Sequence, residues 1–338
     1  MESMAATGAL AFDVSDGGTL LLRGEDRQAF LHNFCTNNIE TLESGATVEA
    51  FVTDMRGRVL SHVWVHNARE TLWLQCVASP VEPLRDHFDR YIITEDVTLD
   101  VVTGQVERIL VSGEAAGNAA DRIAEALGSQ GLEDLHRMSV DWLGTGDILL
   151  TLGRSDAESD ATETESTVLL LAAVACGLPI GTPESFTARR VAAGLPVVGV
   201  DIGPSDLAQE VERDDLAIAF DKGCYLGQET IARVQSRGQV NRLLRGVTWS
   251  VDSEAPPDRQ PQVGAVIRMA GDETHTPRGT LTSIVQPEHA IQQGTGRALG
   301  LSIVRREAVE GDGGVEIETP AGWVPAKLVT RQSSPVVD

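Results

Sequence analysis

The chain has 338 residues, of which 42% are hydrophobic and only 4% aromatic, and it carries 50 acidic against 27 basic residues. This length suits two or three domains, and no apolar run approaches the roughly 18 residues of a membrane-spanning helix. A formal net charge of −23 argues against non-specific nucleic-acid binding through a basic face. The first ten residues, MESMAATGAL, lack a basic segment followed by a long apolar one, so we expect a cytoplasmic protein.

The acidic residues are spread along the whole chain, and the only lysines are Lys222 and Lys327. An acidic tail or a surface for a basic partner would instead concentrate the charge in one segment. A dispersed acidic surface with arginine in place of lysine is typical of proteins adapted to high salt, where screening weakens self-repulsion. We therefore expect a halophilic archaeal origin, and the acidity then says little about the substrate.

The first hundred residues predict one α+β part. Residues 18–24 predict a strand, residues 25–35 a helix, and residues 46–77 hairpins around a turn at 67–70. Residues 80–92 predict an amphipathic helix with Leu84, Phe88 and Tyr91 facing inward. Strands and helices are interleaved without the regular rhythm of a parallel sheet, so the pattern favours an α+β fold over a doubly wound one.

Residues 101–245 predict a second α+β part. Strands are expected at 106–113 and 146–153, with a helix at 118–129 between them. Residues 155–167 are polar and acidic, which predicts a long or disordered loop. Residues 168–194 predict two helices broken at Gly177 and Pro179 and ending at Gly194.

The predicted secondary structure changes after Arg245. Residues 246–331 hold short β-rich runs separated by turns with glycine and proline, and helical periodicity is nearly absent. We expect a small all-β domain here, in the form of a barrel.

The four cysteines, Cys35, Cys76, Cys176 and Cys224, are far apart and form no Cys-x-x-Cys pair. This spacing is unlike that of a structural zinc or cluster-binding site, and disulfides are not expected in a reducing compartment. Cys76 and Cys176 lie in apolar surroundings and are expected to be inert core residues.

Residues 221–229, DKGCYLGQE, place one of the two lysines and one of the four cysteines on either side of a glycine. Glycines on both sides of Cys224 allow a tight turn and close approach to a ligand, and Gln228 and Glu229 could begin a helix. Positive charge from Lys222, Arg233 and Arg237 would lower a thiol pKa, as at reactive cysteines. A small residue on a tight turn explains the same pattern, and the residues alone leave both interpretations open.

The segment KGCYLGQETIAR resembles the Lys-Gly-Cys-aromatic-x-Gly-Gln-Glu signature of YgfZ-type folate-binding proteins. These are relatives of the T-protein, the aminomethyltransferase of the glycine cleavage system, and together they form a GcvT-like superfamily. Three further segments resemble the same proteins. One precedes the motif, ARRVAAGLPVVGVDI, and two are N-terminal, DRQAFLHNFCTNNIETLESG and AFVTDMRGRVLSHVWV. The resemblance covers nearly the whole chain.

The resemblance implies a three-domain ring of two α+β domains, residues 1–100 and 101–245, and a C-terminal β-barrel at 246–331. It implies tetrahydrofolate or a one-carbon-substituted folate as ligand, and a role with iron–sulfur enzymes or their assembly factors and, through one of these, in tRNA modification. The acidic charge and the lack of a long apolar run predict no direct nucleic-acid partner and no membrane partner. Cys224 and Lys222 would be the catalytic residues, and no metal site is expected. The expected folate contacts are Arg190, Asp54, Trp142, Gln228, Glu229 and Arg233.

Two of these contacts have a plain structural alternative. Arg190 could be a helix arginine paired with an acid, and Asp54, beside Arg56, could be an ordinary turn residue.

Departures from the T-protein weigh against glycine-cleavage chemistry. Where the T-protein has a folate-lining tyrosine and glutamate, this chain reads DWLGTGDILL, with Trp142 and no such glutamate. The T-protein's catalytic aspartate has no clear counterpart, so electrostatic help to a developing iminium would be lost.

The leading hypothesis is a YgfZ-like folate-binding protein that supports maturation or repair of iron–sulfur enzymes. The alternatives are a folate-dependent aminomethyltransferase or related demethylase, and a non-catalytic adaptor. Enzyme activity is therefore left open.

Overall fold

The computed structural model describes residues 8–132, 134–144, 146–154, 167–250, 256–285, 297–311 and 313–330. The chain divides into two compact units. Unit 1 consists of Met1–Asp54, Leu60–Pro183 and Asp215–Leu226, and unit 2 of Met55–Val59, Glu184–Asp214 and Gly227–Asp338. Unit 1 includes residues from both expected α+β parts, so the finer boundary at residue 100 stays a prediction.

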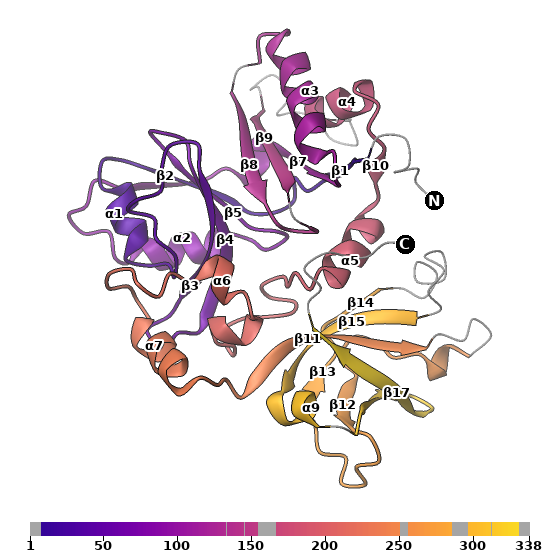
Figure 1. Cartoon of the computed structure of the whole chain (residues 1–338). Coiled ribbons are helices and arrows are strands. Elements are labelled where there is room, and N and C mark those ends of the chain that lie inside the picture. The colour runs from indigo at the N-terminus through magenta and orange to yellow at the C-terminus, as the bar shows by residue number, and fades with distance from the viewer. Residues whose placement is uncertain are drawn as a thin grey trace. The chain divides into compact units, whose positions relative to one another are not determined.

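The first sheet of unit 1 has the strand order β3-β4-β5-β2-β6 (Figure 1). Its strands are β2 (Thr19–Arg23), β3 (Thr47–Thr53), β4 (Val59–Asn67), β5 (Leu72–Gln75) and β6 (Thr98–Val101). Alternate residues of β2, β4 and β5 share a core with helices α1 (Arg27–His32) and α2 (Glu82–Asp89). The core forms because side chains two apart along a strand lie on the same face. The predicted hairpins at 46–77 are confirmed.

The predicted inward position of Tyr91 is wrong. Helix α2 ends at Asp89, two residues earlier, and the Tyr91 side chain is 40% exposed. Leu84 and Phe88 do face inward, as predicted. Helical spacing predicts which side chains face inward only within the helix, and Tyr91 lies beyond its end.

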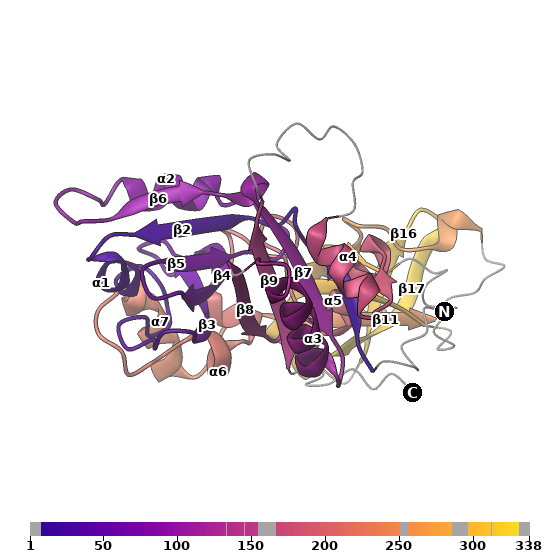
Figure 2. The same cartoon turned by 90° about the horizontal axis from the view of Figure 1, so that it is seen from above.

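The second sheet of unit 1 has the order β10-β1-β7-β9-β8, antiparallel except for the parallel β1–β10 pair. Its strands are β1 (Leu10–Asp13), β7 (Val106–Ser112), β8 (Leu135–Val140), β9 (Asp147–Gly153) and β10 (Ile180–Gly181). Helices α3 (Ala116–Gly128) and α4 (Val168–Ala175) share a core with β7 and β9 (Figure 2). The predicted strands at 106–113 and 146–153 and the helix between them are confirmed, whereas β8 was not predicted. Most of the predicted acidic loop, residues 155–166, lies outside the described residues.

A buried arginine joins the two sheets of unit 1. Because Ile109 and Val111 of β7 point toward α3 and α4, Arg108 points to the opposite face. Its Nη1 donates to the Gly17 carbonyl at 2.5 Å, and its Nη2 donates to the Cys76 carbonyl at 2.9 Å. The close approach requires glycine at position 17, where an added Cβ would lie 2.7 Å from the guanidinium. Burial lowers the pKa of Arg108 to about 10. This agrees with its hydrogen bonds, because in the described chain no carboxylate, which would raise the pKa, is bonded to the guanidinium.

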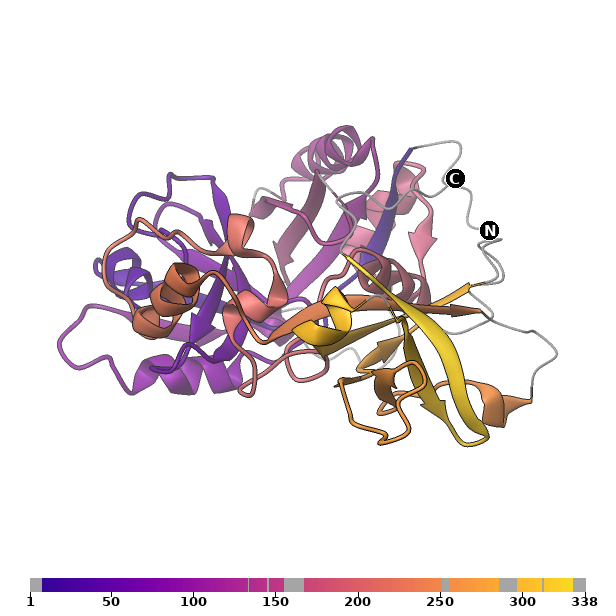
Figure 3. The ribbon, with the colours of Figure 1, turned by 60° about the horizontal axis from the view of Figure 1, so that its bottom comes forward.

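Unit 2 is built around a closed barrel in which β11, β17, β16, β12, β13 and β15 pair in that order and β15 pairs back with β11 (Figure 3). The barrel confirms the all-β prediction for the end of the chain. The strands are β11 (Arg242–Ser250), β12 (Val266–Met269), β13 (Gly279–Thr280), β15 (Arg297–Arg305), β16 (Val315–Thr319) and β17 (Gly322–Val329), with β14 (Ser283–Ile284) added to β15. Strand β11 begins at Arg242, so it crosses the expected boundary at residue 245.

Helices and 3-10 turns before and between the barrel strands complete the fold. Unit 2 also holds α5 (Pro183–Ala192), the 3-10 turns Ala208–Val211 and Pro257–Arg259, α7 (Gln228–Arg237) and α9 (Arg306–Glu310). Another 3-10 turn, Thr103–Gln105, precedes β7, and α6 (Asp214–Ala217) lies where the chain returns to unit 1. The two predicted helices of residues 168–194 are confirmed as α4 and α5. In the described part of the chain, no helix is both long and apolar enough to cross a bilayer.

The buried histidine His66 of unit 1 should make the stability of the unit depend on pH. Burial, together with the nearby His136 ring at 6.1 Å, lowers the pKa of His66 from 6.5 to about 4. The unfolded chain therefore binds the proton more tightly, and stability should be complete above pH 6.5 and fall as the pH drops toward 4. The full shift corresponds to at most about 3 kcal/mol.

Urea unfolding at several pH values between 4 and 7 gives the free energy of unfolding of the unchanged chain and of His66→Gln. The difference between the two pH slopes of this free energy measures the contribution of His66. The difference is needed because burial raises the pKa of Asp147 to about 6, which contributes stability that is lost as the pH rises through that value. Equal pH slopes for the two proteins would contradict the assignment to His66.

Candidate functional site

Lys222 binds the backbone of the turn that follows α1. Its ammonium donates three hydrogen bonds, to the carbonyls of His32 at 2.6 Å, Cys35 at 2.7 Å and Asn37 at 2.8 Å. The ammonium also lies 4.8 Å from the centre of the Tyr225 ring. Burial lowers the pKa of Lys222. Three donors on one compact nitrogen match three converging carbonyls, whereas the planar fork of arginine does not. This geometry explains why a chain that otherwise uses arginine has lysine here.

The residues after Lys222 lie against the same turn and the end of β3. We call residues 222–226 the motif turn. The Leu226 N–H donates to the Asn33 carbonyl at 2.9 Å, and the Thr53 hydroxyl donates to the Leu226 carbonyl at 2.9 Å. The motif turn is therefore held by hydrogen bonds to residues 32–37 and to the strand end next to Asp54.

Cys224, in the motif turn, is the one exposed cysteine of the four. Cys35 and Cys76 are buried, and burial raises the pKa of the Cys35 thiol to about 11 and raises that of Cys76. Cys176 is half-buried. Exposure on a hydrogen-bonded turn makes Cys224 accessible to a ligand or partner, and its catalytic role stays a prediction.

Asp54 lies beside an aromatic cluster of unit 1 that comprises Phe30, Phe34, His87, Phe88 and Tyr91. Ring centroids within this cluster are separated by 4.7 Å for Phe30 and Phe34, 4.9 Å for Phe34 and Tyr91, and 5.3 Å for His87 and Tyr91. Burial and Arg90 lower the pKa of His87, while the Asp54 carboxylate opposes the shift. The buried Nε2 of His87 has no hydrogen-bond partner within the described chain. The structure thus places a carboxylate, an orphaned ring nitrogen and an exposed tyrosine in one neighbourhood.

Trp142 is completely buried in unit 1. Its ring packs edge-on against Trp64 at 5.4 Å, and the Arg108 guanidinium lies 5.8 Å from its centre. Its indole Nε1 is buried and has no partner among the described residues. These contacts give Trp142 a packing role beside Arg108, and its expected folate contact stays a prediction.

Arg190 belongs to unit 2, where its guanidinium is buried in a polar network. Nη1 donates to the Asp201 carboxylate at 2.9 Å and to the Leu195 carbonyl at 3.2 Å, and Nη2 donates to the Ser283 hydroxyl at 2.8 Å. These bonds connect α5 with the turn at Asp201 and with β14. The ion-pair alternative for Arg190 is therefore observed, and contact with folate stays a prediction.

Helix α7 carries the other three expected contacts. It begins at Gln228, directly after Gly227, whose φ of 90° lies in the left-handed region that glycine tolerates. Glu229 and Arg233 form an exposed ion pair of 2.7 Å one helical turn apart. The expected helix start is confirmed. The structure thus assigns Gln228, Glu229 and Arg233, with Arg190, to unit 2, and Lys222, Cys224, Asp54 and Trp142 to unit 1.

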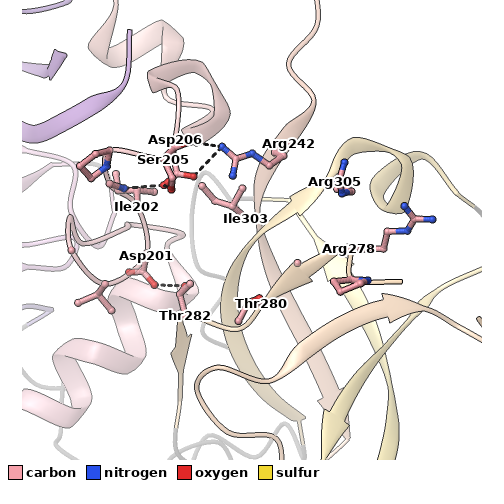
Figure 4. Close-up of a pocket in the computed structure, with 16 residues that line it drawn as sticks. Asp201, Ile202, Ser205, Asp206, Arg242, Arg278, Thr280, Thr282, Ile303 and Arg305 are labelled. Atoms are coloured by element: carbon pink, nitrogen blue, oxygen red, sulfur yellow. Dashed lines mark hydrogen bonds and ion pairs between the residues drawn. The ribbon is translucent and has the colours of Figure 1, made fainter. Parts of the chain in front are cut away.

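A cavity of about 550 Å³ lies within unit 2, between the turn of residues 199–206 and the barrel (Figure 4). Arg242, Arg278 and Arg305 line it together with Asp201 and Asp206. Arg242 pairs with Asp206 at 3.2 Å and with Glu210 at 2.7 Å. Sequence reasoning missed this cavity because its arginines belong to no motif and come together only through strand pairing. In the described part of the chain, no group of acidic, histidine and cysteine side chains could hold a metal ion.

Comparison with known proteins agrees with the resemblance seen in the motif. Residues 3–145 match the GCVT N-terminal domain. The chain is 25% identical over 310 residues to the chloroplastic protein At1g60990 of Arabidopsis thaliana, covering 89% of this chain and 66% of that protein. It is 25% identical over 254 residues to the tRNA-modifying protein YgfZ of Yersinia enterocolitica, covering 74% of this chain and 72% of that protein. The crystal structure of glycine cleavage system aminomethyltransferase T from Bartonella henselae superimposes with a TM-score of 0.72 and 16% identity, covering 96% of this chain and 86% of that one. The predicted α+β fold with a C-terminal barrel is confirmed.

Proposed function

We propose that this chain, a GcvT-like protein with YgfZ-named relatives, binds tetrahydrofolate or a one-carbon-substituted folate and supports iron–sulfur enzymes. Its partners would be such enzymes or their assembly factors, and its effect on tRNA modification would be indirect. The observation that supports the proposal best is the neighbourhood of the motif turn in unit 1. Leu226 of that turn is hydrogen-bonded to Asn33, next to Phe34 of the aromatic cluster, and to Thr53, next to Asp54.

The residues present suit a folate. A pterin needs hydrogen-bonding groups at its edge and an apolar surface against its rings. Asp54 would supply the former, and Tyr91 and Phe34 would supply an aromatic surface, partly exposed at Tyr91. The bound folate would supply a carrier for a one-carbon group, and the chain's own side chains would bind and orient it.

Folate binding can be tested by calorimetry with anaerobic tetrahydrofolate in molar potassium chloride. We expect Asp54→Asn and Tyr91→Ala to weaken binding about tenfold each, because each removes one contact of roughly 1.4 kcal/mol. Asp100→Asn is the matched control, since this exposed carboxylate of unit 1 pairs with Arg23 at 3.3 Å. Unchanged affinity in both test variants would place the folate elsewhere, and no binding to the intact chain would reject the proposal.

The role of Cys224 can be tested separately. Cys224→Ala should leave unfolding and folate affinity unchanged, because the side chain is exposed, but should abolish complementation of a YgfZ-deficient strain. Cys176→Ala is the control and should complement. Full complementation by Cys224→Ala would reject a functional thiol.

The alternative of an aminomethyltransferase rests on the fold shared with the Bartonella henselae enzyme. A glycine-cleavage assay with lipoylated carrier protein and tetrahydrofolate distinguishes the two functions. We expect little or no ammonia release, and robust folate-dependent release would favour the transferase. An intact fold that binds no folate would favour an adaptor.

A further inference from the structure

Two arginines lie directly opposite each other in the barrel wall of unit 2. Strands β13 and β15 pair antiparallel with Gly279 opposite Val304, so the next position sets Arg278 opposite Arg305. The Arg305 N–H donates to the Arg278 carbonyl at 2.7 Å, which confirms this register. Residues directly opposite on antiparallel strands point to the same face, and like charges there destabilise a sheet. Both residues are among those that line the cavity of about 550 Å³ (Figure 4).

One carboxylate, that of Glu307, neutralises this pair only in part. Arg278 forms an ion pair with Glu307 through Nη1, but its buried Nε has no partner in the described chain. The guanidinium of Arg305 has no hydrogen-bond or ion-pair partner among the described residues. Arg305 is exposed, so its guanidinium is hydrated in the ligand-free protein and is available to a ligand in the cavity.

The cavity's own acids are already satisfied. Asp201 accepts from the Arg190 guanidinium at 2.9 Å and from the hydroxyls of Thr282 and Ser283 at 2.6 Å each. Asp206 accepts from the Gly203 N–H at 2.9 Å and pairs with Arg242 at 3.2 Å. Because each carboxylate has its own cation, the charge that remains toward the cavity is positive.

We propose that this cavity binds the phosphate monoester of a small organic molecule, with Arg278 and Arg305 holding the phosphate. Two guanidiniums balance the two charges of a phosphate monoester and donate in the fork geometry that phosphate accepts. The hydroxyl of Thr280 lies next along β13 and also lines the cavity. Ile202 and Ile303 supply apolar wall for the organic part, and the volume falls in the range of small-ligand sites, well above one phosphate ion. The proposal is independent of folate binding.

Calorimetry in low-salt buffer with ribose 5-phosphate, adenosine monophosphate and inorganic phosphate tests the proposal. We expect at least one of the two monoesters to bind more tightly than inorganic phosphate, and Arg305→Ala to weaken that binding at least tenfold. Arg259→Ala, an exposed arginine of the same unit outside the cavity lining, should bind like the unchanged chain. Equal affinity for all three probes, absence of binding, or an equal loss in both variants would overturn the proposal.

A second measurement keeps the test valid if a variant perturbs folding. In the ligand-free protein Arg305→Ala should leave the melting temperature unchanged or raise it, because it removes a like-charge contact. The same variant should keep its affinity for tetrahydrofolate, which separates failure of this site from failure of the folate proposal. A lower melting temperature in Arg305→Ala would show a structural role for the arginine and would overturn the proposal.

Discussion

Replacing Arg108 with methionine should destabilise unit 1 by about 2–4 kcal/mol, because buried neutral acceptors lose their hydrogen bonds to a charged donor. The guanidinium is 0% exposed and donates to four acceptors, the carbonyls of Gly17, Gly18 and Cys76 and the hydroxyl of Thr19. Methionine fills similar volume but removes the donor to the buried carbonyls of Gly17 and Cys76, which is costlier than the loss of the bonds themselves, whereas the Gly18 carbonyl keeps the Cys76 N–H.

Urea unfolding followed by tryptophan fluorescence would measure the effect, because Trp142 lies against the Arg108 guanidinium. Arg137→Met is the matched control, since this arginine on β8 is 41% exposed at its side chain and pairs loosely with Asp121 at 3.4 Å. We expect the control to change stability by less than about 1 kcal/mol. A similar loss in both variants would show that Arg108 is no more important than a surface arginine.

Replacing Lys222 with methionine should destabilise unit 1 by about 2–4 kcal/mol, since three carbonyls lose a charged donor. Lys222→Arg keeps the charge, but its planar fork cannot direct three donors at the carbonyls of His32, Cys35 and Asn37 at once, so we expect about half that loss. Thermal and urea unfolding would measure both variants. Lys327→Met, which alters the other lysine of the chain at an exposed position, should be nearly neutral.

The same variants separate a structural from a chemical role of Lys222. If the lysine positions the motif turn, Lys222→Met should also change the rate at which a disulfide reagent labels the exposed thiol of Cys224. Full stability and an unchanged labelling rate, together with lost complementation, would instead indicate that Lys222 acts in the chemistry.

Local sequence patterns predicted most of the secondary structure. The hairpins at 46–77, the helices broken near Gly177 and the change to an all-β segment after Arg245 depend on periodicity and turn residues within short windows. The errors came where a pattern continued past its element or was too short to read. Tyr91 lies beyond the end of α2, and β8 was not expected at all.

The candidate site was predictable only in part. The motif identified Lys222 and Cys224, and glycine at position 227 marked the start of α7. The functions of the charged side chains could not be predicted, because their partners lie far away in the sequence. Lys222 binds carbonyls 185–190 residues earlier, and Arg190, besides the expected kind of ion pair with an acid, donates to Ser283, 93 residues later.

The sequence by itself determined the fold class, the resemblance to YgfZ-type proteins and the candidate thiol Cys224, because these depend on residue type, spacing and local period. The exposure of that thiol came only from the structure. Only the tertiary structure decided what the charges do. Every residue has a backbone carbonyl, so the sequence does not show which carbonyls accept a hydrogen bond from a side chain. The three bonds of Lys222 and the four acceptors of Arg108 are therefore known only from the folded chain. Strand register likewise set Arg278 opposite Arg305 and turned two scattered arginines into one site.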